Sequence, residues 1–318
     1  MGKILLIVSE RNDPVTDEIY KWLLRLDEGC IIKRLNYEDE ILHLNINLQK
    51  KEVSIRTREE HILISKVHKI WYRRGFLNYL KNKDTSPYRN YISDEYSKLH
   101  DGLWALWEEK SISSFLNNRV NKLEMLFKAE KFGIKIPNTI YTDSKKELEC
   151  FFEDNKKGII TKAIENAGFY NEKEKQTFGE GTKIVEKSDI ENSPEYFCIS
   201  KFQEKVEKLF EIRTMYYKQH FFSMAIISQQ NSKTQVDFRN YDEENPNRNI
   251  PYQLPENIEL KIIKLMKSLD LVTGSIDLIL TTDNEYVFLE VNPFGQYLPV
   301  DYLLGDEISK LIAIDILN

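Results

Sequence analysis

Short apolar runs and amphipathic stretches alternate along the first third of the chain. The apolar run at 4–8 is followed by polar residues and Pro14, which predicts a buried strand, a loop and then a helix. Residues 41–66 alternate apolar and polar positions without a helical period, which favours hairpin strands. The other predicted elements are helices at 16–26 and 86–109 and strands at 31–35 and 69–72. Together these elements predict a small α/β domain over residues 1–111.

The middle of the chain combines helical and strand patterns with one long polar segment. Helices are predicted at 121–132 and 144–152, and a strand at 158–163. Gly133 marks the end of the first of these helices. The segment 165–181 is polar and charged and contains three glycines, so we interpret it as a mobile loop and a candidate lid.

The last third of the chain is dominated by strand patterns. Strands are predicted at 199–202, 208–217, 220–228, 274–281 and 285–292, and helices at 255–269 and 308–317. The polar segment 231–254 is interpreted as a second loop. The whole pattern predicts an α/β (α+β) protein with three parts, at 1–111, 112–200 and 201–318.

Composition and charge narrow the range of functions. The 318 residues are 41% hydrophobic and 30% charged, and the net charge of −6 argues against a protein whose main partner is nucleic acid. Three scattered cysteines without a CxxC pair indicate a reducing compartment with neither disulfides nor a zinc site. No apolar stretch approaches the roughly 20 residues that span a bilayer, and the N-terminus is typical of a strand and not of a signal peptide. We therefore expect a cytoplasmic protein without a membrane partner.

The last predicted hairpin carries two carboxylates that can face each other. A two-residue turn at Asp283-Asn284 would place Asp277 directly opposite Glu290, with Asn292 on the same face. Like charges in this position destabilise a hairpin, whereas two carboxylates and an amide oxygen suit Mg²⁺. The alternative is a solvated sheet edge on which the carboxylates repel weakly.

The same turn predicts two distinct faces for this hairpin. An apolar face would carry Ile276, Leu278, Leu280, Val287, Leu289 and Val291. The carboxylate face would continue with Ile279, Thr281, Tyr286 and Phe288.

An earlier predicted hairpin, which turns at Lys218-Gln219, places Glu211 and Arg213 on one strand face. Glu211 could accept a ribose hydroxyl, and a guanidinium suits a transferring phosphoryl group. The alternative is an ordinary surface ion pair.

Two lysines and one strand end could serve a nucleotide. Lys122 opens a helix and Lys162 ends a strand, so each could bind phosphate, but each could equally be a solvated surface charge. The sequence Phe-Gln-Glu-Lys-Val at 202–206 follows a strand and could form an adenine-binding hinge. Neither a Walker loop nor a GxGxxG motif is present, so the two commonest phosphate cradles are absent.

Taken in order, these segments resemble the ATP-grasp superfamily, and within it the graspetide (microviridin-type) peptide maturases. The segments are Lys69-Ile-Trp-Tyr-Arg-Arg-Gly75, Asn118-Arg-Val-Asn-Lys122, Lys162, Phe202-Gln-Glu204, Glu211-Ile-Arg213, Val236-Asp-Phe-Arg239 and Phe288-Leu-Glu-Val-Asn-Pro293. The resemblance implies an ATP-grasp fold with an N-terminal pre-ATP-grasp α/β domain, a central lid subdomain and a C-terminal catalytic antiparallel sheet. Pro-Phe-Gly-Gln-Tyr after Asn292 replaces the glycine-rich turn common in ATP-grasp ligases, which fits the maturase branch.

The resemblance also implies ATP and Mg²⁺ as cofactors and assigns a role to each matching position. Lys122 and Lys162 would hold the phosphates, Gln203, Glu204 and Val206 would form the adenine hinge, and Glu211 would contact the ribose or the substrate. Arg213 would stabilise the transferring γ-phosphoryl group, Asp277, Glu290 and Asn292 would hold Mg²⁺, and Asp237 and Arg239 would recognise the acidic substrate side chain.

The implied reaction activates Asp or Glu side chains of a leader-bearing precursor peptide and joins them to Ser, Thr or Lys. Alternatives are a ligase for a free amino acid or small acid, a glutamate ligase acting on a protein C-terminus, and a non-catalytic nucleotide- or peptide-binding protein. Arg73 and Arg74 could contact the substrate or form a structural salt bridge. Dimers are common in the superfamily, so a homodimer is also considered.

Overall fold

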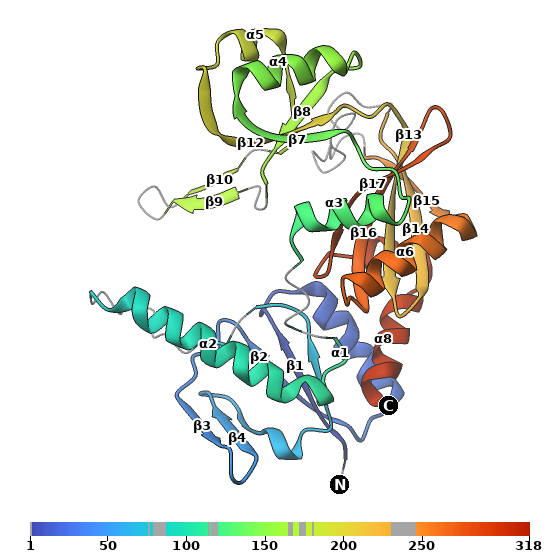
Figure 1. The fold of residues 1–318 in the computed structure, drawn as a ribbon. Helices are drawn as coiled ribbons and strands as arrows, with labels where there is room; N and C mark the ends of the chain where they lie inside the picture. The colour runs from blue at the N-terminus through green and yellow to red at the C-terminus, as the bar shows by residue number, and fades with distance from the viewer. Residues whose placement is uncertain are drawn as a thin grey trace. The chain divides into compact units, whose positions relative to one another are not determined.

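The computed structural model describes residues 2–75, 77–78, 87–113, 115, 120–164, 168–171, 176–179, 181–229 and 246–318 (Figure 1). The chain divides into two units. One comprises Met1–Arg119, Asp270–Thr273 and Pro293–Asn318, and the other comprises Val120–Leu269 and Gly274–Asn292. This partition does not test the three-part division expected from the sequence, which stays a prediction.

The first unit is built on a parallel sheet of the strands predicted near the N-terminus. Its order is β2 (Ile31–Asn36), β1 (Ile4–Ser9) and β6 (Lys69–Tyr72). Side chains of β1 alternate between the two faces of the sheet, and Leu6 and Val8 pack into a core that contains Trp104 and Trp107 of α2 (Arg89–Trp107). Helix α1 (Pro14–Leu26) packs against α8 (Glu307–Leu317).

A separate antiparallel sheet belongs to the same unit. Its strands are β3 (His43–Asn47), β4 (Glu52–Arg56) and β5 (His61–Leu63), which confirms the hairpin strands predicted within 41–66. The short helix α7 (Leu298–Leu303) leads into α8.

The second unit contains an antiparallel sheet in the order β11, β8, β12 and β7. The bounds are Lys183–Val185, Ile159–Lys162, Tyr196–Glu204 and Thr139–Ser144, and the helices are α4 (Lys145–Asp154) and α5 (Lys187–Glu191). One face of the sheet packs against these helices through Ile159 and Phe202, which join Leu148, Phe151 and Ile190 in a common core. We call this four-stranded layer the lid sheet.

The segment interpreted as a mobile loop at 165–181 contains a hairpin, so that interpretation was wrong for its described part. Strands β9 (Gly168–Asn171) and β10 (Gln176–Gly179) pair antiparallel, with Phe169 opposite Phe178. The overall polarity of the segment hid two short runs of strand-favouring aromatic and threonine residues.

The other sheet of this unit has the order β15, β14, β13, β16 and β17. The bounds are Arg248–Tyr252, His220–Ile227, Lys208–Tyr217, Thr273–Thr281 and Tyr286–Asn292, with helices α3 (Lys122–Lys131) and α6 (Glu256–Ser268). The turn between β13 and β14 has positive φ at Lys218 and Gln219, as a tight hairpin requires. We call this layer the catalytic sheet.

Strand β15 corrects a second loop interpretation, because it lies within the segment 231–254. It is an edge strand that pairs only with β14, and Pro251 in its middle is tolerated there because an edge strand has one unpaired side.

Candidate active site

The carboxylate hairpin is formed by β16 and β17, and Asp277 lies directly opposite Glu290, which confirms the predicted pairing. The turn differs from the prediction. It closes between Thr281 and Glu285, whose N–H and carbonyl are 2.9 Å apart, and Asn284 has a φ of 61°. The loop is thus one residue longer than expected, and a register shift between Asp277 and Leu278 restores the predicted pairing.

The longer loop changes the faces near the turn, so that part of the prediction was wrong. Phe288 lies opposite Leu278 and is completely buried, whereas it was expected on the carboxylate face. Val287 lies opposite Ile279 instead of sharing a face with Leu278. The bulge confines the predicted alternation to the end of the hairpin that carries the carboxylates.

Arg213 of β13 reaches Asp277 on the neighbouring strand β16. Its Nε donates to Oδ1 at 2.9 Å and its Nη2 to Oδ2 at 3.0 Å, which is a bidentate ion pair. The two side chains are only 19% and 15% exposed, so this pair is shielded from solvent. Arg213 therefore fixes the orientation of the Asp277 carboxylate.

Lys122 lies at the first turn of α3, and its ammonium is 3.3 Å from the Glu290 carboxylate. The helix begins there because Asn121 caps it, accepting hydrogen bonds from the N–H groups of residues 123 and 124. Met125 holds α3 against β17 through its sulfur, which accepts from the Val291 N–H.

These two ion pairs meet at the opposed carboxylates. The order across the structure is Arg213, Asp277, Glu290 and Lys122, so that cations flank the pair of anions. We call these four residues the charge row. Asn292 ends β17 two residues beyond Glu290 and is exposed. Three residues predicted to hold a metal and two predicted to bind phosphate are thus brought together.

The donors of this site fit Mg²⁺. Mg²⁺ in nucleotide enzymes takes one or two carboxylates and completes its shell with water and phosphate oxygens. Asp277 and Glu290 supply the carboxylates, and both are partly accessible. The parts of the chain that the structure describes contain no group of three or more His, Cys, Asp or Glu residues that could hold a metal. The remaining ligands would therefore be the Asn292 amide oxygen and the nucleotide.

Glu211 is buried, and both of its carboxylate oxygens are engaged. Lys208 donates to Oε1 at 2.6 Å and Ser228 to Oε2 at 2.7 Å. Sequence reasoning missed Lys208, because strand alternation puts residues three apart on opposite faces. The role of Glu211 at the ribose or the substrate stays a prediction.

The predicted hinge lies at the end of β12. The N–H of Glu204 donates to the carbonyl of Asn138 at 2.9 Å, and its carboxylate accepts from the Asn138 N–H at 3.1 Å. Gln203 is buried and donates to the Thr139 hydroxyl at 2.8 Å. Val206 is half-buried in the connection to β13. These contacts tie β12 to the start of β7 and hold the hinge residues in place.

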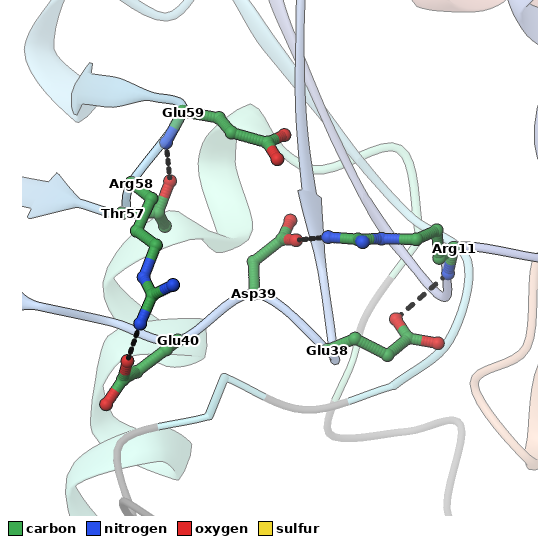
Figure 2. A pocket seen from close by; sticks show the side chains of 7 residues that line it. All are labelled: Arg11, Glu38, Asp39, Glu40, Thr57, Arg58 and Glu59. Carbon is green, nitrogen blue, oxygen red and sulfur yellow. Dashed lines mark hydrogen bonds and ion pairs between the residues drawn. The ribbon is translucent and has the colours of Figure 1, made fainter.

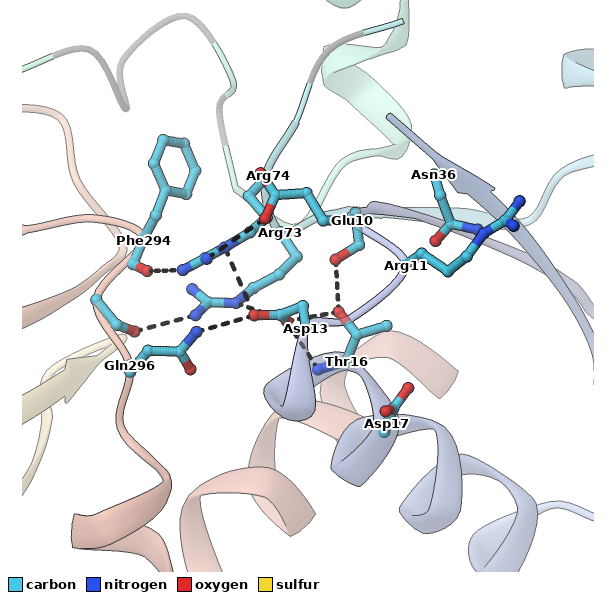
Figure 3. Close-up of polar contacts among 12 residues, drawn as sticks. Glu10, Arg11, Asp13, Thr16, Asp17, Asn36, Arg73, Arg74, Phe294 and Gln296 are labelled. Atoms are coloured by element: carbon cyan, nitrogen blue, oxygen red, sulfur yellow. Dashed lines mark hydrogen bonds and ion pairs between the residues drawn. The ribbon is translucent and has the colours of Figure 1, made fainter. Parts of the chain in front are cut away.

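Asp13 is the centre of a polar network in the first unit (Figure 3). It caps α1 by accepting from the Thr16 N–H at 2.9 Å, and it accepts from Gln296 at 3.1 Å and Arg73 at 3.3 Å. Burial by itself would raise the pKa of Asp13, but the charge of Arg73 and the hydrogen bonds outweigh it, so the pKa is lowered. Asp13 is therefore a buried anion in the folded chain.

The two arginines of the WYRRG segment bind backbone carbonyls near the C-terminus. Arg73 donates to the Gly295 carbonyl at 3.2 Å, and Arg74 donates to the Phe294 carbonyl at 2.8 Å. Burial lowers the pKa of Arg73 although Asp13 opposes this effect. The structural salt bridge, one of the two alternatives for these arginines, is confirmed.

The first unit also contains a polar pocket of about 380 Å³ next to β4 and β5 (Figure 2). It is lined by Arg11, Glu38, Asp39, Glu40, Thr57, Arg58 and Glu59. Arg11 pairs with Asp39 at 2.7 Å, and Arg58 lies 3.6 Å from Glu40. Both arginines of the pocket thus have acidic partners within it.

Two predicted substrate-recognition residues, Asp237 and Arg239, lie outside the described residues, as do residues 118 and 119 of the segment that ends at Lys122. Lys162 is described and ends β8 in the lid sheet, where it lies directly opposite Lys201.

No protein-family model matches the chain, and neither does any curated protein. Solved structures match over nearly its whole length. The macrocyclase MdnC bound with precursor peptide MdnA from Microcystis aeruginosa MRC is 25% identical, with a TM-score of 0.80 and 99% of both chains covered. The chain has the ATP-grasp fold.

Two further ATP-grasp structures agree with this assignment. One is a Chryseobacterium gregarium RiPP-associated ATP-grasp ligase in complex with ADP and a leader and core peptide, at 24% identity and a TM-score of 0.82, with 99% of this chain and 96% of that chain covered. The other is the ATP-grasp ligase PsnB with a phosphomimetic variant of minimal precursor, Mg and ADP, at 14% identity and a TM-score of 0.72, with 100% and 98% covered. The predicted α/β ATP-grasp fold is therefore confirmed, and no helix among the described residues is long and apolar enough to cross a membrane.

Proposed function

We propose that this chain is an ATP-dependent carboxylate ligase that crosslinks a precursor peptide, as graspetide maturases do. The observation that carries the proposal is the charge row at Arg213, Asp277, Glu290 and Lys122 on an ATP-grasp fold. An acid pair flanked by cations suits a nucleotide with its metal ion better than it suits a structural hairpin, in which opposed carboxylates only destabilise.

The reaction needs ATP because a carboxylate is a poor acyl donor. A side-chain carboxylate oxygen of the peptide attacks the γ-phosphorus of ATP, and ADP leaves with the bridging oxygen. A hydroxyl or amine of the same peptide then attacks the acyl carbon, and inorganic phosphate leaves as the nucleophile loses its proton. The net result is one ester or amide bond, one ADP and one phosphate, with the peptide lighter by one water.

The chain's own residues would orient and neutralise the reacting groups. Arg213 would stabilise the charge on the transferring phosphoryl group while its other contacts hold Asp277. Lys122 and Lys162 would bind phosphates. Mg²⁺, held by the hairpin carboxylates with Asn292, would supply charge neutralisation at the phosphate oxygens.

The adenine and ribose would be bound by the connection between β12 and β13. Gln203, Glu204 and Val206 would read the base at the hinge, and Glu211 would accept from a ribose hydroxyl. The short tethers from Glu204 to Asn138 and from Gln203 to Thr139 support this role, because a hinge fixed on both sides presents its backbone groups at constant positions.

The partner in this proposal is a precursor peptide with a leader segment. The structures of MdnC and of the Chryseobacterium ligase contain such peptides, which supports a peptide substrate here. Asp237 and Arg239 would recognise the acidic side chain to be activated. A homodimer stays a prediction, which light scattering on the purified chain would check.

Mass spectrometry of a candidate precursor, encoded beside the gene and incubated with the protein, ATP and Mg²⁺, tests the proposal. Successive losses of one water are expected, and Glu290→Gln should abolish them. An unchanged peptide together with ADP release on a free amino acid or small acid would replace the proposal by a small-substrate ligase.

A further inference from the structure

The face of the lid sheet that lies away from α4 and α5 carries a row of three side chains (Figure 1). Lys201 of β12 lies directly opposite Lys162 of β8 on one side and Tyr141 of β7 on the other. Phe202, the next residue of β12, points to the other face and packs in the core with Ile159. Two ammonium groups from neighbouring strands therefore share the face without helices.

Such a pair of lysines is costly unless an anion is near. Directly opposed residues have Cβ atoms about 5 Å apart, and like charges at that separation destabilise a sheet. Lys201 is also only 2% exposed, so its ammonium is largely removed from water. Its ammonium lies 5.9 Å from the centre of the Tyr141 ring, a contact that offsets only part of this cost.

The surroundings hold Lys201 in place and leave the row accessible at one end. The carbonyl of Lys201 accepts from the Thr161 hydroxyl at 3.0 Å, and Gln203, two residues further on the same face, is fixed by Thr139. Lys162 is half-buried, so the row opens on the β8 side. A ligand that enters beside Lys162 would meet the second ammonium at once.

We infer that Lys201 is a second phosphate-binding lysine, which acts with Lys162 on the phosphate chain of the nucleotide. This inference rests on the proposed function, since it assumes that the chain binds ATP. A polyphosphate carries several negative charges at short spacing, so two adjacent ammonium groups match it better than one does. The resemblance to known maturases assigns phosphate binding to Lys122 and Lys162 only, and the lid-sheet register adds Lys201.

The test is the affinity of the full chain for ATP, ADP, AMP and adenosine, measured by calorimetry for the wild type and for Lys201→Met. A hydrogen bond to a charged group contributes about 1.5–3 kcal/mol, so the Kd for ATP should rise about 10-fold to 100-fold. The Kd for adenosine should stay within about twofold, because adenosine has no phosphate. Lys201→Gln, which keeps polarity and a similar length, should give the same pattern if Lys201→Met folds poorly.

Lys183→Met is the matched control. Lys183 lies opposite Thr161 in the same sheet, but it is exposed and on the face that carries Phe202. Its substitution should change none of the four affinities.

Three outcomes would overturn the inference. Equal losses of ATP and adenosine affinity would show that Lys201 only supports the sheet, and an unchanged affinity for ATP would show that it does not reach the phosphates. A wild-type chain that binds no ATP at all would instead refute the proposed function, and the inference with it.

Discussion

Replacing Arg213 by lysine keeps a positive charge next to Asp277 but removes the guanidinium fork. The two parallel hydrogen bonds of 2.9 and 3.0 Å would become at most one. Because both side chains are more than four-fifths buried, the lost bond to a charged partner should cost about 1.5–3 kcal/mol of unfolding free energy. For a unit of this size, that loss lowers Tm by about 3–12 °C.

The same substitution should slow the reaction more than it destabilises the fold. Removing one positioned donor from a developing oxyanion typically lowers kcat by about 10² to 10³, and the retained charge of lysine places the expected loss near 10². Thermal unfolding gives the first quantity. Phosphate release with a precursor peptide at saturating ATP gives the second.

Arg248→Lys is the control for this prediction, since Arg248 lies on the exposed edge strand β15 of the same sheet. Its effect on stability should be within about 0.5 kcal/mol. If Arg213→Lys kept both Tm and kcat at wild-type values, Arg213 would neither fix Asp277 nor contact the transferring group.

Three further predictions follow from packing and charge. Gly274→Ala should cost about 1–3 kcal/mol in urea unfolding, because its Cβ would lie 2.5 Å from the Val291 side chain, and an unchanged midpoint would refute this close approach. Lys208→Met should cost about 3 kcal/mol by leaving the buried Glu211 without its cation, and adding Glu211→Gln should recover part of the loss. The lowered pKa of Asp13 contributes stability above the ordinary Asp pKa, so unfolding free energy should fall below about pH 4, and Asp13→Asn should flatten this acid limb.

The pairing of Asp277 with Glu290 could be predicted from sequence because a hairpin is a local structure. Two strand-favouring runs and a short polar turn leave few registers. The register was still obtained through two errors that cancel, since the loop is one residue longer than predicted and the bulge absorbs that residue. Burial of Phe288 shows where the local rule failed, because sequence alternation cannot reveal a bulge.

The contacts that turn this hairpin into a candidate site could not be predicted in the same way. Arg213 meets Asp277 only because β13 and β16 are neighbours in the sheet, although many residues separate them in the chain. Lys122 meets Glu290 because α3 packs against β17. Such long-range neighbours depend on strand order and helix packing, and neither leaves a period in the sequence.

Buried lysines mark a further limit of sequence reasoning. Lys201 and Lys208 are two of 45 basic residues, and most lysines are solvated, so nothing in the sequence separates them from the rest. Only the register of the lid sheet and the position of Glu211 reveal that both are held inside the protein.

The central claim is that a peptide carboxylate becomes an acyl phosphate, and oxygen labelling tests it most directly. A precursor with ¹⁸O in its Asp and Glu side-chain carboxyls would be incubated with the protein, ATP and Mg²⁺, and the released phosphate would be analysed by mass spectrometry. The account predicts one ¹⁸O atom in phosphate for each bond formed, because the attacking carboxylate oxygen leaves with the phosphate. Crosslinked peptide together with unlabelled phosphate would contradict the account.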